Sequence, residues 1–305
     1  MVAAWLCLSV LPGVRAEGGS TTEPVRPLKV VTVNLYHGGP FSGLLGDGQH
    51  LDRRLEMVAK ELRGLDPDII GLQEASESRQ RGNVAARLAA RLGLHHVYAT
   101  ANPRPFKNGR VNRLIASLLN FSEGPAIVSR FPIVAWESLD LPRCGRYADS
   151  RLLLHATLQS PWGGLDVFST HTIGDPCQTG RVAQLVRNRR GPFPSVLMGD
   201  FNATEDSLAI AAITRNGGFI DAFRTVNPSL PGLTVWQRID ASISMVQRRV
   251  DYLFVCPGEE YRGKVLSSRV ILNSPQELPD GRSLWPSDHY GVLAEMGVFP
   301  PNRRP

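Results

Sequence analysis

The chain has 305 residues, of which 42% are apolar and 20% charged, with 29 Gly and 23 Pro. These proportions are those of ordinary globular proteins and exclude a mostly disordered, collagen-like or coiled-coil chain. A formal net charge of +6 permits attraction to nucleic acid or to anionic membrane without requiring either.

The first 16 residues have the pattern of a secretory signal peptide. Residues 2–11 are VAAWLCLSVL, an apolar run of h-region length, and Val14 and Ala16 stand where a signal peptidase reads. No Lys or Arg precedes this run, so an N-terminal buried strand or helix is the alternative. We expect a signal peptide at 1–16, a flexible linker at 17–27 and a secreted, extracellular or periplasmic protein. No other apolar run reaches the roughly 18 residues that a membrane helix needs, so we expect no transmembrane segment.

Nine short runs rich in β-branched residues and flanked by Gly, Pro or Asp predict β-strands. They lie at 28–34, 68–74, 124–130, 151–158, 165–171, 195–202, 248–255, 268–272 and 289–296. Apolar residues at helical spacing predict helices at 52–62, 84–92 and 182–186. Many strands with helices between them indicate a layered α/β or α+β fold. Because no second linker follows, we expect one domain at 28–297 and a disordered tail at 298–305.

The ends of these strands carry the polar residues that suggest chemistry. They are Asn34, Glu74, His171, Asp200 and Asn202 at the ends of strands, and Asp288 and His289 at the start of the last one. If neighbouring strands end at one edge of a sheet, these side chains meet in a single cleft. Polar residues scattered over loops would not meet in this way.

Three of these side chains are oxygen donors of the kind that a hard divalent cation prefers. Asn34, Glu74 and Asp288 suit Mg²⁺, which keeps several waters and takes one or two carboxylates beside phosphate oxygens. The sequence has no cluster of Cys and His at the spacing of a zinc site. The three residues therefore predict a metal site for the hydrolysis of phosphate esters.

The remaining residues suit the activation of a water for attack on phosphorus. His289 is a candidate general base, and the carboxylate of Asp251, in the apolar run VDYLFV, would hold its imidazole in one tautomer. Asp200 and Asn202 flank Phe201, so they share a strand face and would orient the water and a phosphate oxygen. His171 would bind the phosphoryl oxygens or protonate the leaving group.

Each of these residues also has a structural interpretation, as a turn, a cap, an ion-pair partner or a core histidine. We assign only a structural role to His37, His50, His95, His96 and His155. Arg146, Tyr147 and Arg151 lead into a predicted strand. There they either contact substrate phosphate or form surface ion pairs, and the sequence leaves both interpretations open.

Seven short motifs follow one another along the chain. They are TVN at 32–34, LQE at 72–74, GPAIVSR at 124–130, STH at 169–171, GDFN at 199–202, RRVDYLFV at 248–255 and PSDHYGV at 286–292. In this order they resemble the metal-dependent endonuclease/exonuclease/phosphatase superfamily, with its deoxyribonuclease-I-like fold. The resemblance covers about 29–297 and implies an α/β (α+β) fold, a four-layer sandwich of two packed mixed β-sheets flanked by helices. It also implies a Mg²⁺ or Mn²⁺ site centred on Glu74, and an Asp251–His289 pair.

Within this superfamily the apurinic-site nucleases lack a histidine at the place of His171, so the resemblance points to a secreted, bacterial-type member. Extracellular deoxyribonucleases, bacterial sphingomyelinases, inositol-phosphate phosphatases and deadenylases remain. The likeness to secreted sphingomyelinase-type members implies a disulfide between Cys144 and Cys177. We expect Cys256 to be a buried, unpaired residue. An aromatic hairpin for entering lipid is not evident, because Trp236 is isolated in the sequence.

We therefore expect a secreted Mg²⁺-dependent phosphoric ester hydrolase, a nuclease-like phosphodiesterase that works as a monomer without an obligate protein partner. Its positive charge favours nucleic acid over phospholipid as the phosphoester substrate. The alternatives are a sphingomyelinase or other phospholipid-headgroup hydrolase, an inositol-phosphate phosphatase, and a non-catalytic exported binding module. The loops at 36–51, 101–122 and 226–247 are expected to wall the cleft.

Overall fold

The computed structural model describes residues 26–37, 49–101, 118, 121–144 and 150–299. The predicted signal peptide, most of the linker at 17–27, and Arg146 and Tyr147 lie outside the described residues. Residues 300–305 of the predicted tail at 298–305 also lie outside them, whereas residues 298 and 299 belong to the last strand rather than to a tail. So do parts of the predicted loops at 36–51 and 101–122. Within the described part, every helix is too short or too polar to cross a membrane.

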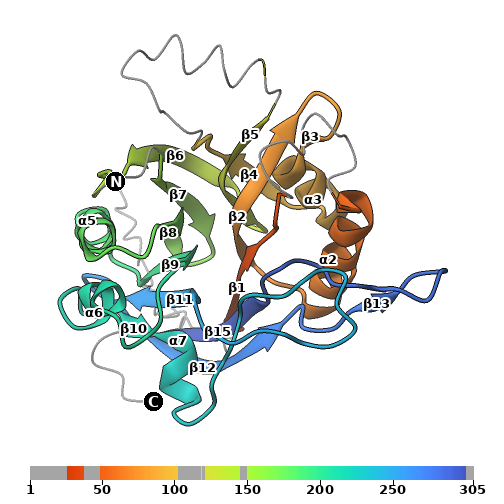
Figure 1. Ribbon diagram of the computed structural model, residues 1–305. Helices are drawn as coiled ribbons and strands as arrows, with labels where there is room; N and C mark the ends of the chain where they lie inside the picture. Colours follow the sequence, from red (N-terminus) through yellow and green to blue (C-terminus); the bar gives the residue numbers. More distant parts are fainter. Residues whose placement is uncertain (1–25, 38–48, 102–117, 119–120, 145–149, 300–305) are drawn as a thin grey trace, which may run out of the picture.

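The first of two large sheets has seven strands in the order β12-β15-β1-β2-β5-β4, with β3 paired to β2. Its strands are β1 (Leu28–Asn34), β2 (Ile69–Ser78), β3 (Gly82–Asn83), β4 (His95–Tyr98), β5 (Ser122–Ser129), β12 (Arg262–Ile271) and β15 (Gly291–Phe299). β1 and β2 are parallel, and the other pairs are antiparallel. Helices α2 (Leu51–Leu65) and α3 (Val84–Leu92) pack on its outer face (Figure 1).

The second sheet has six strands in the order β10-β11-β9-β8-β7-β6. Its strands are β6 (Ile133–Asp140), β7 (Leu152–Ser160), β8 (Gly163–His171), β9 (Ser195–Asp200), β10 (Ile220–Asp221) and β11 (Asp251–Cys256). Only β8 and β9 are parallel among the pairs of this sheet. Helices α5 (Pro176–Arg187) and α6 (Leu208–Thr214) cover its outer face. The short helix α7 (Ala222–Val226) follows β10, and β13 (Gln276–Glu277) pairs with β14 (Ser283–Leu284) in a separate small hairpin.

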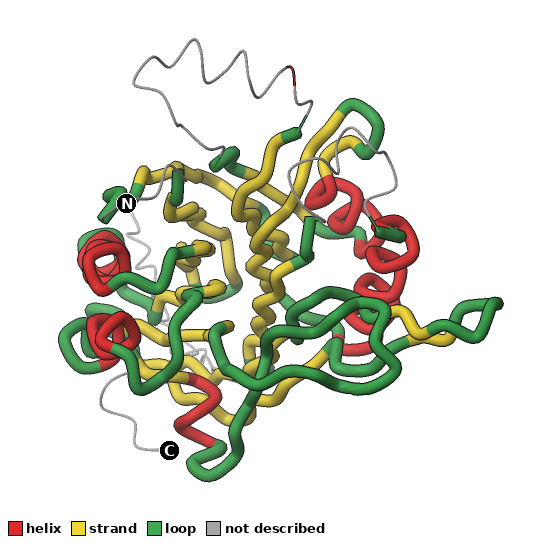
Figure 2. Tube along the Cα trace, in the orientation of Figure 1, coloured by secondary structure: helices red, strands yellow, loops and turns green. Residues whose placement is uncertain are grey.

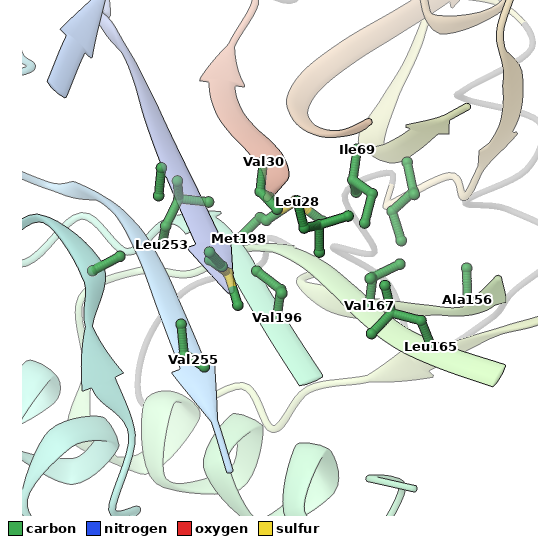
Figure 3. Close-up of a cluster of buried hydrophobic side chains, with 14 of the residues drawn as sticks. Leu28, Val30, Ile69, Ala156, Leu165, Val167, Val196, Met198, Leu253 and Val255 are labelled. Atoms are coloured by element: carbon green, nitrogen blue, oxygen red, sulfur yellow. The ribbon is translucent and has the colours of Figure 1, made fainter. Parts of the chain in front are cut away.

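The inner faces of the two sheets meet in one apolar layer, shown in Figure 3. Val30 and Ile69 come from the first sheet, and Val196 and Met198 from the second. Gly71 lets the sheets approach closely, because a Cβ at this position would lie 2.6 Å from the Cβ of Met198. This packing fixes the relative position of the strand ends in the two sheets.

Local sequence signals set the helices that brace the sheets. In α2, Leu51, Leu55, Val58 and Leu62 are buried on one face against the first sheet, as an amphipathic helix requires. Helix α5 begins at Pro176, where the side chain of Asp175 accepts a hydrogen bond from the backbone N–H of Cys177 at 2.8 Å.

The cysteines are arranged as predicted. Cys144 and Cys177 form a disulfide with Cα atoms 5.9 Å apart, and Cys256 is buried and free. The bond joins the segment before β7 to the start of α5, and so ties together two segments near the end of β8.

The α+β sandwich of two packed mixed sheets confirms the predicted fold class, but several boundaries were wrong. β9 ends at Asp200 rather than at residue 202, because Asn202 has a positive φ of 50° that leaves the strand conformation. β11 begins at Asp251 rather than at 248, because Arg248 pairs instead with Val235 in the loop before it. β4 and β6 were not predicted, since these edge strands are half exposed and carry a weaker apolar signal.

The chain between α7 and β11 has no regular secondary structure and crosses the structure as a long green tube in Figure 2. Val235 makes isolated bridges to Arg248 and to His289. The backbone N–H of Gln237 donates to the carbonyl oxygen of Asp288 at 2.8 Å. The predicted loop at 226–247 therefore does lie beside the segment that carries Asp288 and His289.

Candidate active site

The strands end so that polar side chains from both sheets meet at one edge of the sandwich. In the first sheet Asn34 pairs with Gln73, next to Glu74. In the second, Asp200 pairs with His171 of the parallel strand β8 and with Asp251 of the antiparallel strand β11. Parallel neighbours end, and antiparallel neighbours begin, at the same edge of a sheet.

The amide of Asn34 links the two sheets at this edge. Its Nδ2 donates to Glu74 Oε1 and to Asp200 Oδ2, each at 3.1 Å. Its Oδ1 accepts the backbone N–H of Tyr36 at 3.0 Å, which fixes the orientation of the amide. Asn34 and Asp200 are both buried. A predicted metal ligand and a predicted catalytic residue are thus joined through one side chain.

Glu74 reaches the site through an irregularity in β2. The register between β2 and β5 shifts between Leu72 and Ala75, and Glu74 has a positive φ of 51°. A bulge of this kind redirects a side chain, and such backbone strain is concentrated at functional sites.

His289 and Asp251 form the predicted pair. Nδ1 of His289 lies 2.9 Å from Asp251 Oδ2, and its Nε2 lies 3.7 Å from Asp200 Oδ2. Burial by itself lowers the pKa of His289, but the charges of Asp251 and Asp200 outweigh it and hold this pKa well above its ordinary value. Burial, with repulsion from Asp251, raises the pKa of Asp200 to about 7.

His171 lies on the other side of Asp200. Its Nε2 is 2.9 Å from Asn202 Nδ2 and 3.4 Å from Asp200 Oδ2. Burial, and then the charge of Arg151, hold the pKa of His171 well below its ordinary value. His171 is therefore neutral, and its Nε2 accepts the hydrogen bond from Asn202. Asn202 lies beyond the end of β9, so it meets Asp200 through a turn rather than on a shared strand face, as its N–H donates to Asp200 Oδ1 at 2.9 Å.

Asp288 faces the same edge from the segment before β15. The hydroxyl of Ser287 donates to the carbonyl oxygen of Asn34 at 2.6 Å and so fixes this segment against β1. Burial, and then repulsion from Glu74, raise the pKa of Asp288 to about 6, although His289 opposes the shift. The two carboxylates repel each other and offer the oxygen ligands that a hard divalent cation prefers. Asn34, the third predicted metal ligand, instead turns its Nδ2 toward Glu74 and Asp200 and its Oδ1 toward the N–H of Tyr36.

A buried arginine holds the backbone around these residues. The guanidinium of Arg54 donates to the carbonyl oxygens of Leu35, Tyr36 and Pro286 at 2.9, 2.9 and 3.2 Å. It therefore connects the loop after β1 to the segment that carries Asp288 and His289. Burial lowers the pKa of Arg54 to about 10, so the group remains charged at neutral pH.

The model of the Endonuclease/Exonuclease/phosphatase family matches residues 31–289, most of the chain. The chain belongs to this family. No curated protein is similar enough in sequence to count as a match.

Solved structures share the fold of this family member at low sequence identity. A family protein from Leptotrichia buccalis has a TM-score of 0.64 and 20% identity, over 88% of this chain and 99% of that one. A mannosyl-6-phosphatase from Bacteroides thetaiotaomicron has a TM-score of 0.63 and 21% identity, over 88% and 99%. TDP2 from D. rerio, solved with a single-strand DNA product, has a TM-score of 0.61 and 17% identity, over 89% and 99%.

His37, which the sequence analysis gave only a structural role, lies at the edge of the site. In this family member its Nε2 lies 2.7 Å from Glu123 Oε2 and 3.2 Å from Glu74 Oε2. Glu123 was not identified, although it stands directly before the motif GPAIVSR. An acidic residue next to a predicted strand was the available signal. The other histidines with a predicted structural role lie outside this cluster: His95 and His96 on the exposed strand β4, and His155 beside Asp166. His50 lies at the start of α2 and lines the pocket that also contains Tyr36 and Asp288.

Arg151 lies beside the site, where it lines a small cavity together with Glu74, Glu123 and His171. Its Nε is buried and has no hydrogen-bond partner in the described part of the chain. The sequence left Arg151 open between a phosphate contact and a surface ion pair. A buried donor without a partner, on a residue that lines this cavity, is a candidate contact for a phosphate oxygen.

A second, larger pocket of about 360 Å³ adjoins the site at Asp288 and Tyr36. Its far wall includes Trp236, which is 52% exposed. Ile243 and Met245, on the same loop, are also exposed. The loop that carries Trp236 thus exposes three apolar side chains.

Proposed function

We propose that this family member is a secreted, Mg²⁺-dependent phosphodiesterase with nuclease-like activity. The observation that carries the proposal is the linkage at the edge of the sandwich, where Asn34 joins Glu74 to Asp200 and His289 lies between Asp200 and Asp251. Two histidines, three acids and an oxygen-rich cation site in one place suit direct attack of water on phosphorus.

Each protein group has a role that its contacts support. Asp251 accepts the Nδ1–H of His289 and thereby directs Nε2 toward Asp200 and the site. Asp200 and Asn202 orient the attacking water, and His289 takes its proton as the new P–O bond forms. His171 and Arg151 hold phosphoryl oxygens while the bond to the leaving group breaks. A divalent cation at this edge would be held by Glu74 and Asp288, with Asn34 beside them, and would supply charge neutralisation for the phosphoryl group.

Nucleic acid is the proposed substrate class. The net charge of +6 and the unused guanidinium donor of Arg151 both suit a polyanion. The fold alone does not determine the substrate class, because a mannosyl-6-phosphatase and TDP2 with single-strand DNA resemble this chain about equally well. Binding to DNA or RNA should weaken steeply between 50 and 200 mM salt, because phosphate contacts release counterions.

A phospholipid headgroup is the second candidate, supported by the loop beside the larger pocket. Trp236, Ile243 and Met245 expose apolar side chains there. Gln237 holds this loop in shape: its Nε2 donates to the carbonyl oxygen of Ile243 at 3.1 Å, and its Oε1 accepts the N–H of Met245 at 2.7 Å. An apolar loop next to a hydrolytic site suits a substrate presented in a bilayer.

Export is proposed from the N-terminal pattern and the disulfide, which persists in oxidising compartments. A panel assay tests the activity: mature protein with Mg²⁺ against DNA, RNA, sphingomyelin vesicles and inositol phosphates. We expect hydrolysis of nucleic acid that chelation with EDTA stops and that His289→Ala reduces by at least 100-fold. Activity that survives both treatments would contradict the proposed mechanism, whereas activity on vesicles alone would favour the second candidate.

A further inference from the structure

Glu74 presents its two carboxylate oxygens to two different groups of residues. Oε1 accepts the hydrogen bond from Asn34 and so faces the proposed catalytic cation site. Oε2 accepts the backbone N–H of His37 at 3.3 Å and lies 3.2 Å from Nε2 of the same residue. Nε2 of His37 also lies 2.7 Å from Glu123 Oε2. The ligand atoms of His37, Glu74 and Glu123 all lie within 4.8 Å of one another.

These three groups meet because of strand register rather than local sequence. Glu123 pairs with Ser76 across the β2–β5 ladder, on the far side of the bulge that carries Glu74. His37 follows β1, the other neighbour of β2. The guanidinium of Arg81 donates to the carbonyl oxygen of His37 at 3.2 Å, and the ring of Phe121 packs against the imidazole at 5.1 Å. The imidazole is thus held in position by residues outside the cluster.

The distances between the imidazole and the two carboxylates suit a shared metal cation better than a shared proton. A ring nitrogen carries at most one hydrogen, yet Nε2 of His37 faces two carboxylate oxygens at 2.7 and 3.2 Å. When two ligand atoms each lie about 2.1 Å from one cation and the two bonds meet at a right angle, the ligand atoms lie about 3 Å apart. One cation could therefore contact all three groups with little movement, and it would balance two carboxylates.

We propose that His37, Glu74 and Glu123 hold a second divalent cation, with Glu74 bridging it to the catalytic cation site. The imidazole makes this set a mixed nitrogen and oxygen site, which favours Mn²⁺ over Mg²⁺. Bridged cations of this kind sit about 3.5–4 Å apart and act together on a phosphoryl group. Arg151 and His171 line the same small cavity as Glu74 and Glu123, so both basic side chains lie close to the proposed second cation. The inference rests on the proposed function, because it shares Glu74 with that site.

The test counts Mn²⁺ bound to the metal-stripped full chain by calorimetry and electron paramagnetic resonance. Wild type should bind two Mn²⁺, and Glu123→Gln should bind one. The matched control is Glu77→Gln, which removes an exposed carboxylate from the same strand as Glu74 and should still bind two. Pulsed resonance should show a ¹⁴N coupling that disappears in His37→Ala. If Glu123→Gln fails to fold, as judged by circular dichroism, the same count on His37→Ala decides.

One Mn²⁺ in wild type, or two in Glu123→Gln, would overturn the inference. Phosphoester hydrolysis, measured on the same samples, separates this result from the proposed function. Hydrolysis with one bound Mn²⁺ rejects the second site and keeps the proposed function. Two bound Mn²⁺ ions without hydrolysis of any phosphoester keep the second site and reject the proposed function.

Discussion

Replacing Asp251 by Asn should impair the catalytic role of His289 while leaving the protein folded. Oδ2 of Asp251 lies 2.9 Å from Nδ1 of His289, and the two side chains are 0% and 8% exposed. Asn has nearly the same shape, so packing is retained. When its amide nitrogen faces Nδ1, however, the ring proton must move to Nε2, the nitrogen that faces Asp200. The imidazole then cannot accept a proton from water.

The expected loss is large for turnover and small for stability. In the serine-protease triad the same change at the orienting Asp lowers kcat by about 10⁴, and each tenfold loss is about 1.4 kcal/mol. We therefore expect Asp251→Asn to lower kcat by about 10²–10⁴, or about 3–5.5 kcal/mol of activation free energy. Asp200 remains beside the imidazole, and the variant removes one of several mutually repelling acids. The melting temperature should therefore move by less than about 4 °C.

A second histidine–carboxylate pair, remote from the site, provides the matched control. Nε2 of His155 lies 2.8 Å from Asp166 Oδ1 on strands β7 and β8, and Nδ1 lies 3.3 Å from Glu137. Asp166→Asn should change the melting temperature by a similar amount and leave kcat unchanged. Initial rates on a soluble phosphodiester with saturating Mg²⁺ measure the effect. The reasoning is refuted if Asp251→Asn keeps kcat within threefold of wild type, or if Asp166→Asn loses as much.

Three further expectations follow from the same structure. EDTA should abolish hydrolysis, and added Mg²⁺ or Mn²⁺ should restore it in an initial-rate assay; full activity in the chelated protein would exclude a metal role for Glu74 and Asp288. Gly71→Ala should lower the free energy of unfolding by about 1–3 kcal/mol in urea titrations, because its Cβ would overlap Met198. Gly64→Ala in α2, where nothing lies within 4 Å, should instead be neutral or stabilise by up to about 1 kcal/mol. Replacing Cys144 and Cys177 by Ser should cost about 3–4 kcal/mol, since the bond closes a loop with a sequence separation of 33, and reduction of wild type should give the same value.

The sequence was sufficient for the fold class and for the strand-end residues. Buried central strands such as β1 and β9 have continuous apolar runs, and a polar residue that ends such a run must leave the core at its edge. Asn34 and Asp200 could therefore be named, and their meeting expected, from local patterns alone. The family motifs contain the same residues, which is why they predicted the Asp251–His289 pair as well.

The sequence could not locate groups whose position depends on neighbouring strands. Glu123 looks like an ordinary acid before a strand, and His37 like a loop histidine; only the β2–β5 register and the bulge at Glu74 bring them together. Likewise only the fold shows that Gln237 binds the backbone of Ile243 and Met245 and so brings these residues back toward its own part of the loop.

The amino-acid sequence by itself indicated the central buried strands and the polar residues at their ends, because both are set within a few residues. Tertiary structure decided which of those ends share a charge environment, since carboxylates such as Glu74 and Asp288 are distant in sequence and interact only after two sheets have packed. Hydrophobic patterns extend over a few neighbouring residues, so they can be recognised in the sequence. Electrostatic interactions depend on the distance between charges in space, so they are known only once the chain has folded.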